Sequence, residues 1–119
     1  MKTIGKTCAA VAALTTAALP LSATAACLNR TDMHPMQAAA LQQRLMVAAF
    51  TCHDTAAYNR FVLGHRGELQ QSDASLLAYF QDNGGTTAYH TYKTHLANAA
   101  ALESSRSSSF CGNTDELFR

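Results

Sequence analysis

The chain has 119 residues, with nine basic and eight acidic side chains and a formal net charge of +1. Its basic residues form no run of the kind that neutralises a phosphate backbone, so nothing in the charge pattern favours nucleic-acid binding. The length suits one small domain rather than two.

The first 25 residues have the pattern of a bacterial export signal. Lys2 and Lys6 make a positive start, residues 8–19 form a short apolar run, and residues 23–25 (ATA) supply the small side chains that signal peptidase needs. The apolar run is too short to span a membrane, which takes about 20 apolar residues. We therefore predict removal of residues 1–25 and no membrane span.

The mature chain, residues 26–119, is predicted to be a single helical domain in the periplasm or outside the cell. Loss of the two N-terminal lysines leaves seven basic against eight acidic residues, a net charge of −1. An alternative is that Cys27 is a lipidated first residue. Thr24 argues against this, because lipoprotein signals carry a leucine-like residue at that position.

The composition of the mature chain predicts an all-α fold, a small bundle of about four helices with one disulfide. The mature chain contains no isoleucine and only two valines, Val47 and Val62. Strands favour β-branched residues, whereas the plentiful alanine, leucine, glutamine and arginine lose little entropy in a helix.

The first helix is predicted over residues 35–52, because proline is preorganised for the first helical position. Apolar residues recur there at spacings of four and three, which places them on one face. Met46 and Phe50 lie on the opposite side, and a helix that is apolar on two faces is usually central in its bundle. The main face consists of Leu41, Leu45, Ala48 and Cys52.

A second helix is predicted from Asp54, which is a good N-cap, to about Leu69. His65 falls in the middle of its apolar face, so we expect a partly buried histidine bonded to a tyrosine or to a backbone carbonyl. Gly64 and Gly67 weaken this helix by about 1 kcal/mol each relative to alanine. A break and new cap are predicted at residues 71–73 (QSD).

A short third helix around Leu76 to Phe80 should end at residues 82–85 (DNGG), the strongest turn signal in the chain. Thr86 or Thr87 should then cap a fourth helix that extends to about Leu102. Residues 104–109 are predicted to form a polar loop, and residues 114–118 a last helical turn.

Three cysteines remain after removal of the signal, and a small exported domain favours a structural disulfide. We predict Cys52–Cys111, because Cys52 lies on the apolar face at a helix end and a flexible loop precedes Cys111. The alternative pairing is Cys27–Cys111, and the favoured pairing leaves Cys27 as the third cysteine. His53 is poorly placed to activate Cys52, since adjacent helical residues point about 100° apart.

No catalytic or cofactor motif is recognisable, so the sequence predicts a protein that is not an enzyme and carries no cofactor. No two histidines have the i,i+3 or i,i+4 spacing of a helical metal pair. Met33, His34 and Met36 are soft ligands suited to copper and form a weak candidate metal site. A second candidate is a pocket between helices lined by Tyr58, His65, Tyr89 and Tyr92.

The segments YNRFV (58–62), HR (65–66), AYHTY (88–92) and LAN (96–98) resemble a group of small exported bacterial proteins of uncharacterised function. Members of that group similarly carry cysteines near the mature start, after the first helix and near the C-terminus. Some relatives are labelled adenosylhomocysteine hydrolase, but this chain is too short for a dinucleotide-binding domain and lacks its glycine-rich motif. The resemblance implies export and a helical fold, and no mechanism.

These observations favour an exported protein that acts by binding another envelope or extracellular protein. The alternative function is a periplasmic binder of a metal or small ligand, using either of the two candidate sites.

Overall fold

The computed structural model describes residues 30–119, which form five α-helices and, within that range, no strand. The all-α class is therefore confirmed, with one helix more than the four expected. None of these helices is long and apolar enough to cross a membrane. The helices are α1 (Arg30–Thr51), α2 (Thr55–Gly64), α3 (Arg66–Asp82), α4 (Gly85–Arg106) and α5 (Phe110–Leu117).

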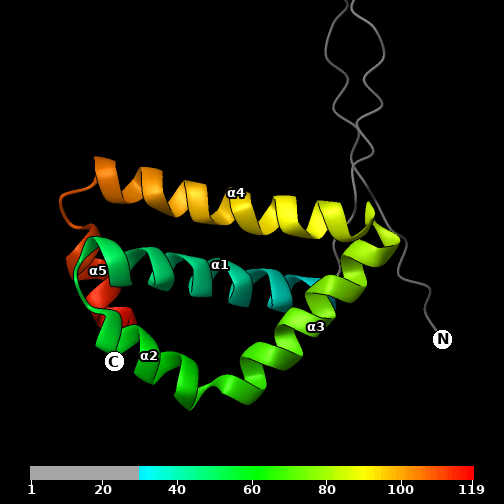
Figure 1. The fold of residues 1–119 in the computed structure, drawn as a ribbon, viewed down its shortest axis with the longest axis horizontal. Coiled ribbons are helices and arrows are strands. Elements are labelled where there is room, and N and C mark those ends of the chain that lie inside the picture. The colour runs from blue at the N-terminus through cyan, green and yellow to red at the C-terminus, as the bar shows by residue number, and fades with distance from the viewer. Residues whose placement is uncertain (1–29) are drawn as a thin grey trace, which may run out of the picture.

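Helix α1 is the centre of the fold and contacts each of the other four helices. Helix α4 runs beside α1 in the same direction, and α2 and α3 together form the bent return between them (Figure 1). Short α5 packs against the end of α1. The central position predicted for the first helix is confirmed by these contacts. The second apolar face cited for it is only partly covered, since Phe50 is 71% exposed.

The predicted start of the first helix was wrong by five residues. Helix α1 begins at Arg30, and Pro35 lies inside it, in the second turn. Proline lacks a backbone N–H, so its presence near a helix start removes only one hydrogen bond of the helix. Cys27 and the predicted export signal precede Arg30, so the predictions for them lie outside the described residues.

The second and third helices divide at His65, and not at residues 71–73 as predicted. Asp54 caps α2 as expected, since its Oδ1 accepts a hydrogen bond from the Ala57 amide at 3.2 Å. The His65 amide then donates to the Phe61 carbonyl at 3.0 Å, and the Leu69 amide donates to the His65 carbonyl at 2.9 Å. His65 thus ends one helix and starts the next.

The turn between α3 and α4 is where the sequence predicted it. Gly84 has φ +100° and Gly85 has φ +76°, a left-handed conformation that favours glycine. A Cβ atom at Gly84 would lie 2.8 Å from the Cβ of Ala88, so glycine is required there for space as well. Helix α4 starts at Gly85, one residue before the predicted threonine cap.

Two predictions near the C-terminus were wrong in extent. Half of the predicted loop 104–109 is helical, since α4 continues to Arg106, and the hydroxyls of Ser104 and Ser105 donate to carbonyls three residues earlier within it. Helix α5 begins at Phe110, four residues before the predicted last turn.

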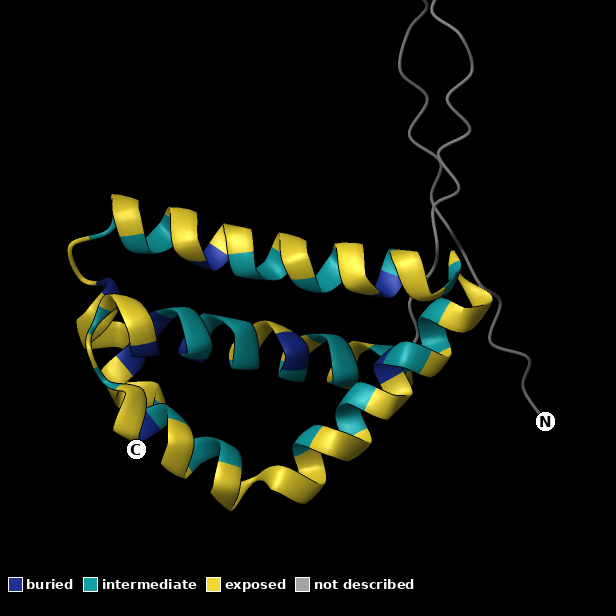
Figure 2. Ribbon diagram, in the orientation of Figure 1, coloured by how far each residue is buried: buried dark blue, intermediate teal, exposed yellow. Residues whose placement is uncertain are grey.

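The buried residues lie where the helices face one another, toward both ends of α1 (Figure 2). One core cluster consists of Ala39, Leu76 and Tyr89, with partly buried side chains packed around it. At the other end of α1, Leu45 and Ala48 are fully buried and Phe110 of α5 is 1% exposed. The packed side chains of the first cluster are Met36, Leu77, Phe80, Tyr92 and Leu96.

Candidate functional site

A cluster of three ionisable side chains joins α3 to α4. The Tyr89 hydroxyl donates to the Asp73 carboxylate, with both Asp73 oxygens 2.7 Å away. The Lys93 ammonium donates to Asp73 Oδ1 at 2.8 Å and to the Tyr89 hydroxyl at 3.0 Å. Tyr89 and Lys93 are one helical turn apart on α4, and Asp73 faces them from the middle of α3.

Each group in this cluster is held in its ordinary charge state at neutral pH. Burial acts to raise the pKa of Asp73, but hydrogen bonds from Lys93 and Tyr89 outweigh it and lower that pKa. Burial raises the pKa of Tyr89. Burial would lower the pKa of Lys93, but its bonds to the other two groups raise it. A general acid or base works best with a pKa near the working pH, so this cluster is suited to joining helices rather than to proton transfer.

Two hollows lie beside α3, on either side of Leu69, which borders both. The larger is an open groove of about 580 Å³ between the start of α1 and α3. The smaller, of about 220 Å³, is lined by residues of α1, α2, α3 and α4 and includes Asp73 and Lys93 of the polar cluster. The groove is lined by Thr31, His34, Pro35, Ala38, Glu68, Leu69, Gln71, Ser72 and Ser75.

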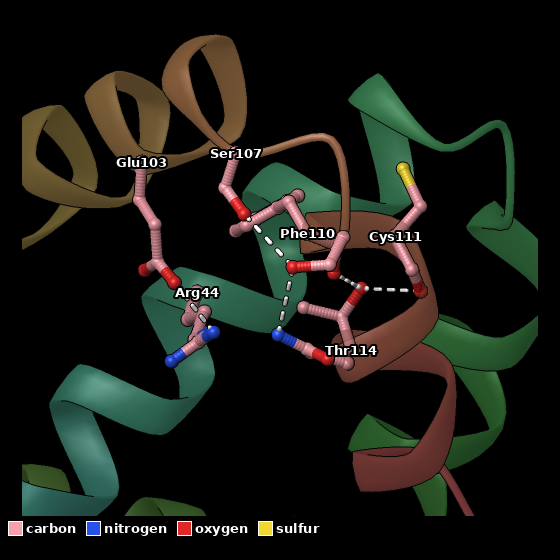
Figure 3. A network of polar contacts seen from close by, with 8 residues as sticks. Arg44, Glu103, Ser107, Phe110, Cys111 and Thr114 are labelled. Carbon is pink, nitrogen blue, oxygen red and sulfur yellow. Dashed lines mark hydrogen bonds and ion pairs between the residues drawn. The ribbon is translucent and has the colours of Figure 1, made fainter.

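A second polar contact joins α1 to the end of α4. The Arg44 guanidinium donates to Glu103 Oε1 at 2.7 Å and lies over the Phe110 ring, 5.7 Å from its centroid (Figure 3). The buried Thr114 hydroxyl donates to the carbonyls of Phe110 and Cys111, at 3.0 and 3.1 Å. Among the buried side-chain nitrogen and oxygen atoms of residues 30–119, Arg44 Nε alone lacks a hydrogen-bond partner, so this end of the molecule has the character of a structural joint.

The predicted disulfide Cys52–Cys111 is present, with an S–S distance of 2.08 Å and 5.6 Å between the Cα atoms. It ties the residue that follows α1 to the first turn of α5. His53, which follows Cys52, is exposed and has φ +57°. This left-handed conformation turns the chain from α1 toward α2. The bond is of the kind that persists in an oxidising compartment.

The structure does not bring together the four residues of the predicted pocket. Tyr58 and His65 belong to the α2 segment, and Tyr89 and Tyr92 belong to α4, and these two helices do not contact each other. The reason is the extra break in the chain, because α2 packs on the end of α1 while α3 takes the position next to α4. His65 is exposed, with its ring 5.2 Å from that of Phe61, so the expected burial of this histidine is wrong.

The three candidate copper ligands take different positions on α1. Met36 packs against the core cluster, Met33 is 44% exposed, and His34 lines the groove. Among residues 30–119, no three histidine, cysteine, aspartate or glutamate side chains are grouped as metal ligands would be. Copper binding by Met33, His34 and Met36 stays a prediction from the sequence alone.

The sequence interpretation missed both Asp73 and Lys93. The contact between Tyr89 and Lys93 could have been predicted, since they have the i,i+4 spacing of helical neighbours. Asp73 had been assigned to a helix break, which hid its contact with α4. The groove residues Glu68 and Ser72 carry no motif, and only the tertiary packing of α1 on α3 identifies them.

Comparison of the chain with protein-family models, with curated proteins and with solved structures gives no match. The resemblance to exported bacterial proteins therefore stays an expectation.

Proposed function

We propose that the protein is exported and acts by binding a helical segment of another envelope or extracellular protein in the groove between α1 and α3. The observation that carries the proposal is the groove itself, an open hollow of about 580 Å³ between the start of α1 and α3. An amphipathic helix commonly binds by placing its apolar face in a groove of its receptor.

The groove walls favour a close helical approach. Ala38 on one wall and Ser72 and Ser75 on the other are small, so a partner backbone can come near, and Leu69 offers an apolar contact.

The charge of the groove narrows the chemistry of the partner. Glu68 makes no ion pair with another described residue. A lysine or arginine beside the apolar stripe of the partner helix would pair with it. The partner is therefore an amphipathic helix that carries leucine-like side chains and one cation.

Export is supported by the disulfide, since such bonds persist in oxidising compartments. Mass spectrometry of the protein recovered from the envelope or medium should give a mature start at Ala26 or at unmodified Cys27. A full-length mass, or a diacylglyceryl group on Cys27, would contradict this part of the proposal.

Photo-crosslinking in the producing cell tests the groove. A benzoylphenylalanine placed at Gln71, which lines the groove, should capture one partner protein, and the same group at exposed Ser108 should not. The cross-link should disappear in Ser75→Arg, which fills the groove, and persist in Ala74→Arg. Ala74 is the matched control, because it is exposed and adjacent but does not line the groove.

Three outcomes would overturn the proposal. The first is a folded, oxidised protein that gives no groove-specific cross-link, and the second is equal loss of the cross-link in both arginine variants. The third is a co-purified small molecule in native mass spectrometry that occupies the groove while no protein is captured.

A further inference from the structure

The second hollow, an open cavity of about 220 Å³ lined by α1, α2, α3 and α4, has a composition different from that of the groove. Its wall contains two cations, one carboxylate, two amides and two apolar side chains, contributed by four helices. We propose that this cavity binds a small organic carboxylate that carries a short branched apolar group. The cavity residues are Gln42, Val62, Arg66, Leu69, Gln70, Asp73 and Lys93.

The charges in the cavity leave one cation without a partner. Lys93 and Asp73 neutralise each other at 2.8 Å. Arg66 makes no ion pair with any residue of the described range and is exposed at the cavity edge. A guanidinium binds a carboxylate through two parallel hydrogen bonds, so a carboxylate is the anion that Arg66 fits best.

The remaining wall suits the rest of such a molecule. Gln42 and Gln70 offer amide donors and acceptors from α1 and α3, whereas Val62 and Leu69 offer an apolar contact from α2 and α3. A water molecule takes about 30 Å³ of liquid volume, so a ligand that fills the cavity would displace about seven waters. That space corresponds to a ligand of about seven to nine non-hydrogen atoms.

Two chemical sources share this description, simple branched carboxylic acids and free branched amino acids. They differ in the ammonium group, which would need an acceptor. Asp73 Oδ2 accepts only from Tyr89, so it has a remaining lone pair for such a group. The two sources are compared directly by titrating 4-methylpentanoate and leucine, which have the same apolar end.

The test is a titration followed by NMR, with 4-methylpentanoate, leucine and the neutral 4-methylpentanamide as probes. At least one of the two carboxylates should bind saturably, with a Kd of about 1 mM, and shift the side-chain amides of Gln42 and Gln70. The order of the two affinities identifies the source. Binding of the neutral amide as tightly as of the carboxylates would overturn the proposal, as would the absence of saturable shifts.

A pair of variants separates the site from general charge effects. Arg66→Gln should weaken binding about tenfold or more, because it removes the bidentate contact. Arg60→Gln makes the same charge change at an exposed position of α2 that does not line the cavity, and it should bind as the wild type does. Equal binding by Arg66→Gln and the wild type would overturn the proposal. The inference does not depend on the groove, since the two hollows share only Leu69.

Discussion

The disulfide should supply a large part of the stability of this domain. Cys52 and Cys111 are 59 residues apart in the sequence, and closing a loop of that length stabilises the folded state by about 4 kcal/mol in the chain-entropy model. Small domains have total stabilities of only about 5–15 kcal/mol, so the loss would be severe. It would also release α5, whose Phe110 is 1% exposed and adjacent to Cys111.

The perturbation is the double variant Cys52→Ser/Cys111→Ser, which leaves no new thiol to form a different pair. Thermal unfolding followed by circular dichroism should show a melting temperature about 15–30 °C below that of the oxidised wild type. Wild type treated with a reductant should melt with the variant, and Ser108→Ala, an exposed change in the same loop, should melt with the oxidised protein. A decrease of less than about 5 °C would contradict this prediction, because the bond would then contribute little to stability.

Four further substitutions have expected effects of different sign or pH dependence, each measured by urea denaturation. Gly84→Ala should lower the free energy of unfolding by about 1 kcal/mol or more, because φ is +100° and the new Cβ would contact Ala88. Gly67→Ala should raise it by about 0.5 kcal/mol, because the new Cβ contacts nothing. Equal effects of the two substitutions would contradict this. Leu76→Ala should cost about 2–5 kcal/mol because Leu76 is fully buried, and a loss below about 1 kcal/mol would show that the site collapses without a cavity. Asp73→Asn should cost about 1 kcal/mol at neutral pH. Since the folded pKa of Asp73 is lowered from 3.8, this contribution is complete above that value and lost as the pH falls through the lowered pKa, so a difference that grows in acid would contradict the assignment.

The sequence predicted the structure correctly where residues close together in the chain determine the local conformation. Asp54 is a helix cap because its side chain satisfies a nearby amide, and Gly84 forms a turn because it tolerates positive φ. The disulfide could be predicted because a cysteine at the end of an apolar helical face must lie near the core. The class of the fold followed from the shortage of β-branched residues.

The errors come from residues whose partners are far away in the chain. Aspartate is a residue type that often caps helices, but the Asp73 carboxylate binds Tyr89 and Lys93, sixteen and twenty residues later. The helix continues through Asp73. Conversely, Gly64 weakens the helix locally, and α2 ends at this residue. The predicted pocket failed for the same reason, since a break moved by six or more residues changes which helix lies next to α4.

Both proposed sites lie on the N-terminal half of α3, and its packing differs from that of the rest of the fold. No residue of α3 before Leu76 is buried, and Leu69 and Ser72 are only partly so. Segments with few buried contacts open at low free-energy cost, and binding surfaces are commonly drawn from them. The disulfide, the buried Phe110 and the pair of Arg44 with Glu103 stabilise the opposite end of α1. Side chains on the first half of α3 can therefore be matched to a ligand with little loss of stability, whereas changes to the disulfide or to the buried Phe110 would lower the stability of the domain substantially.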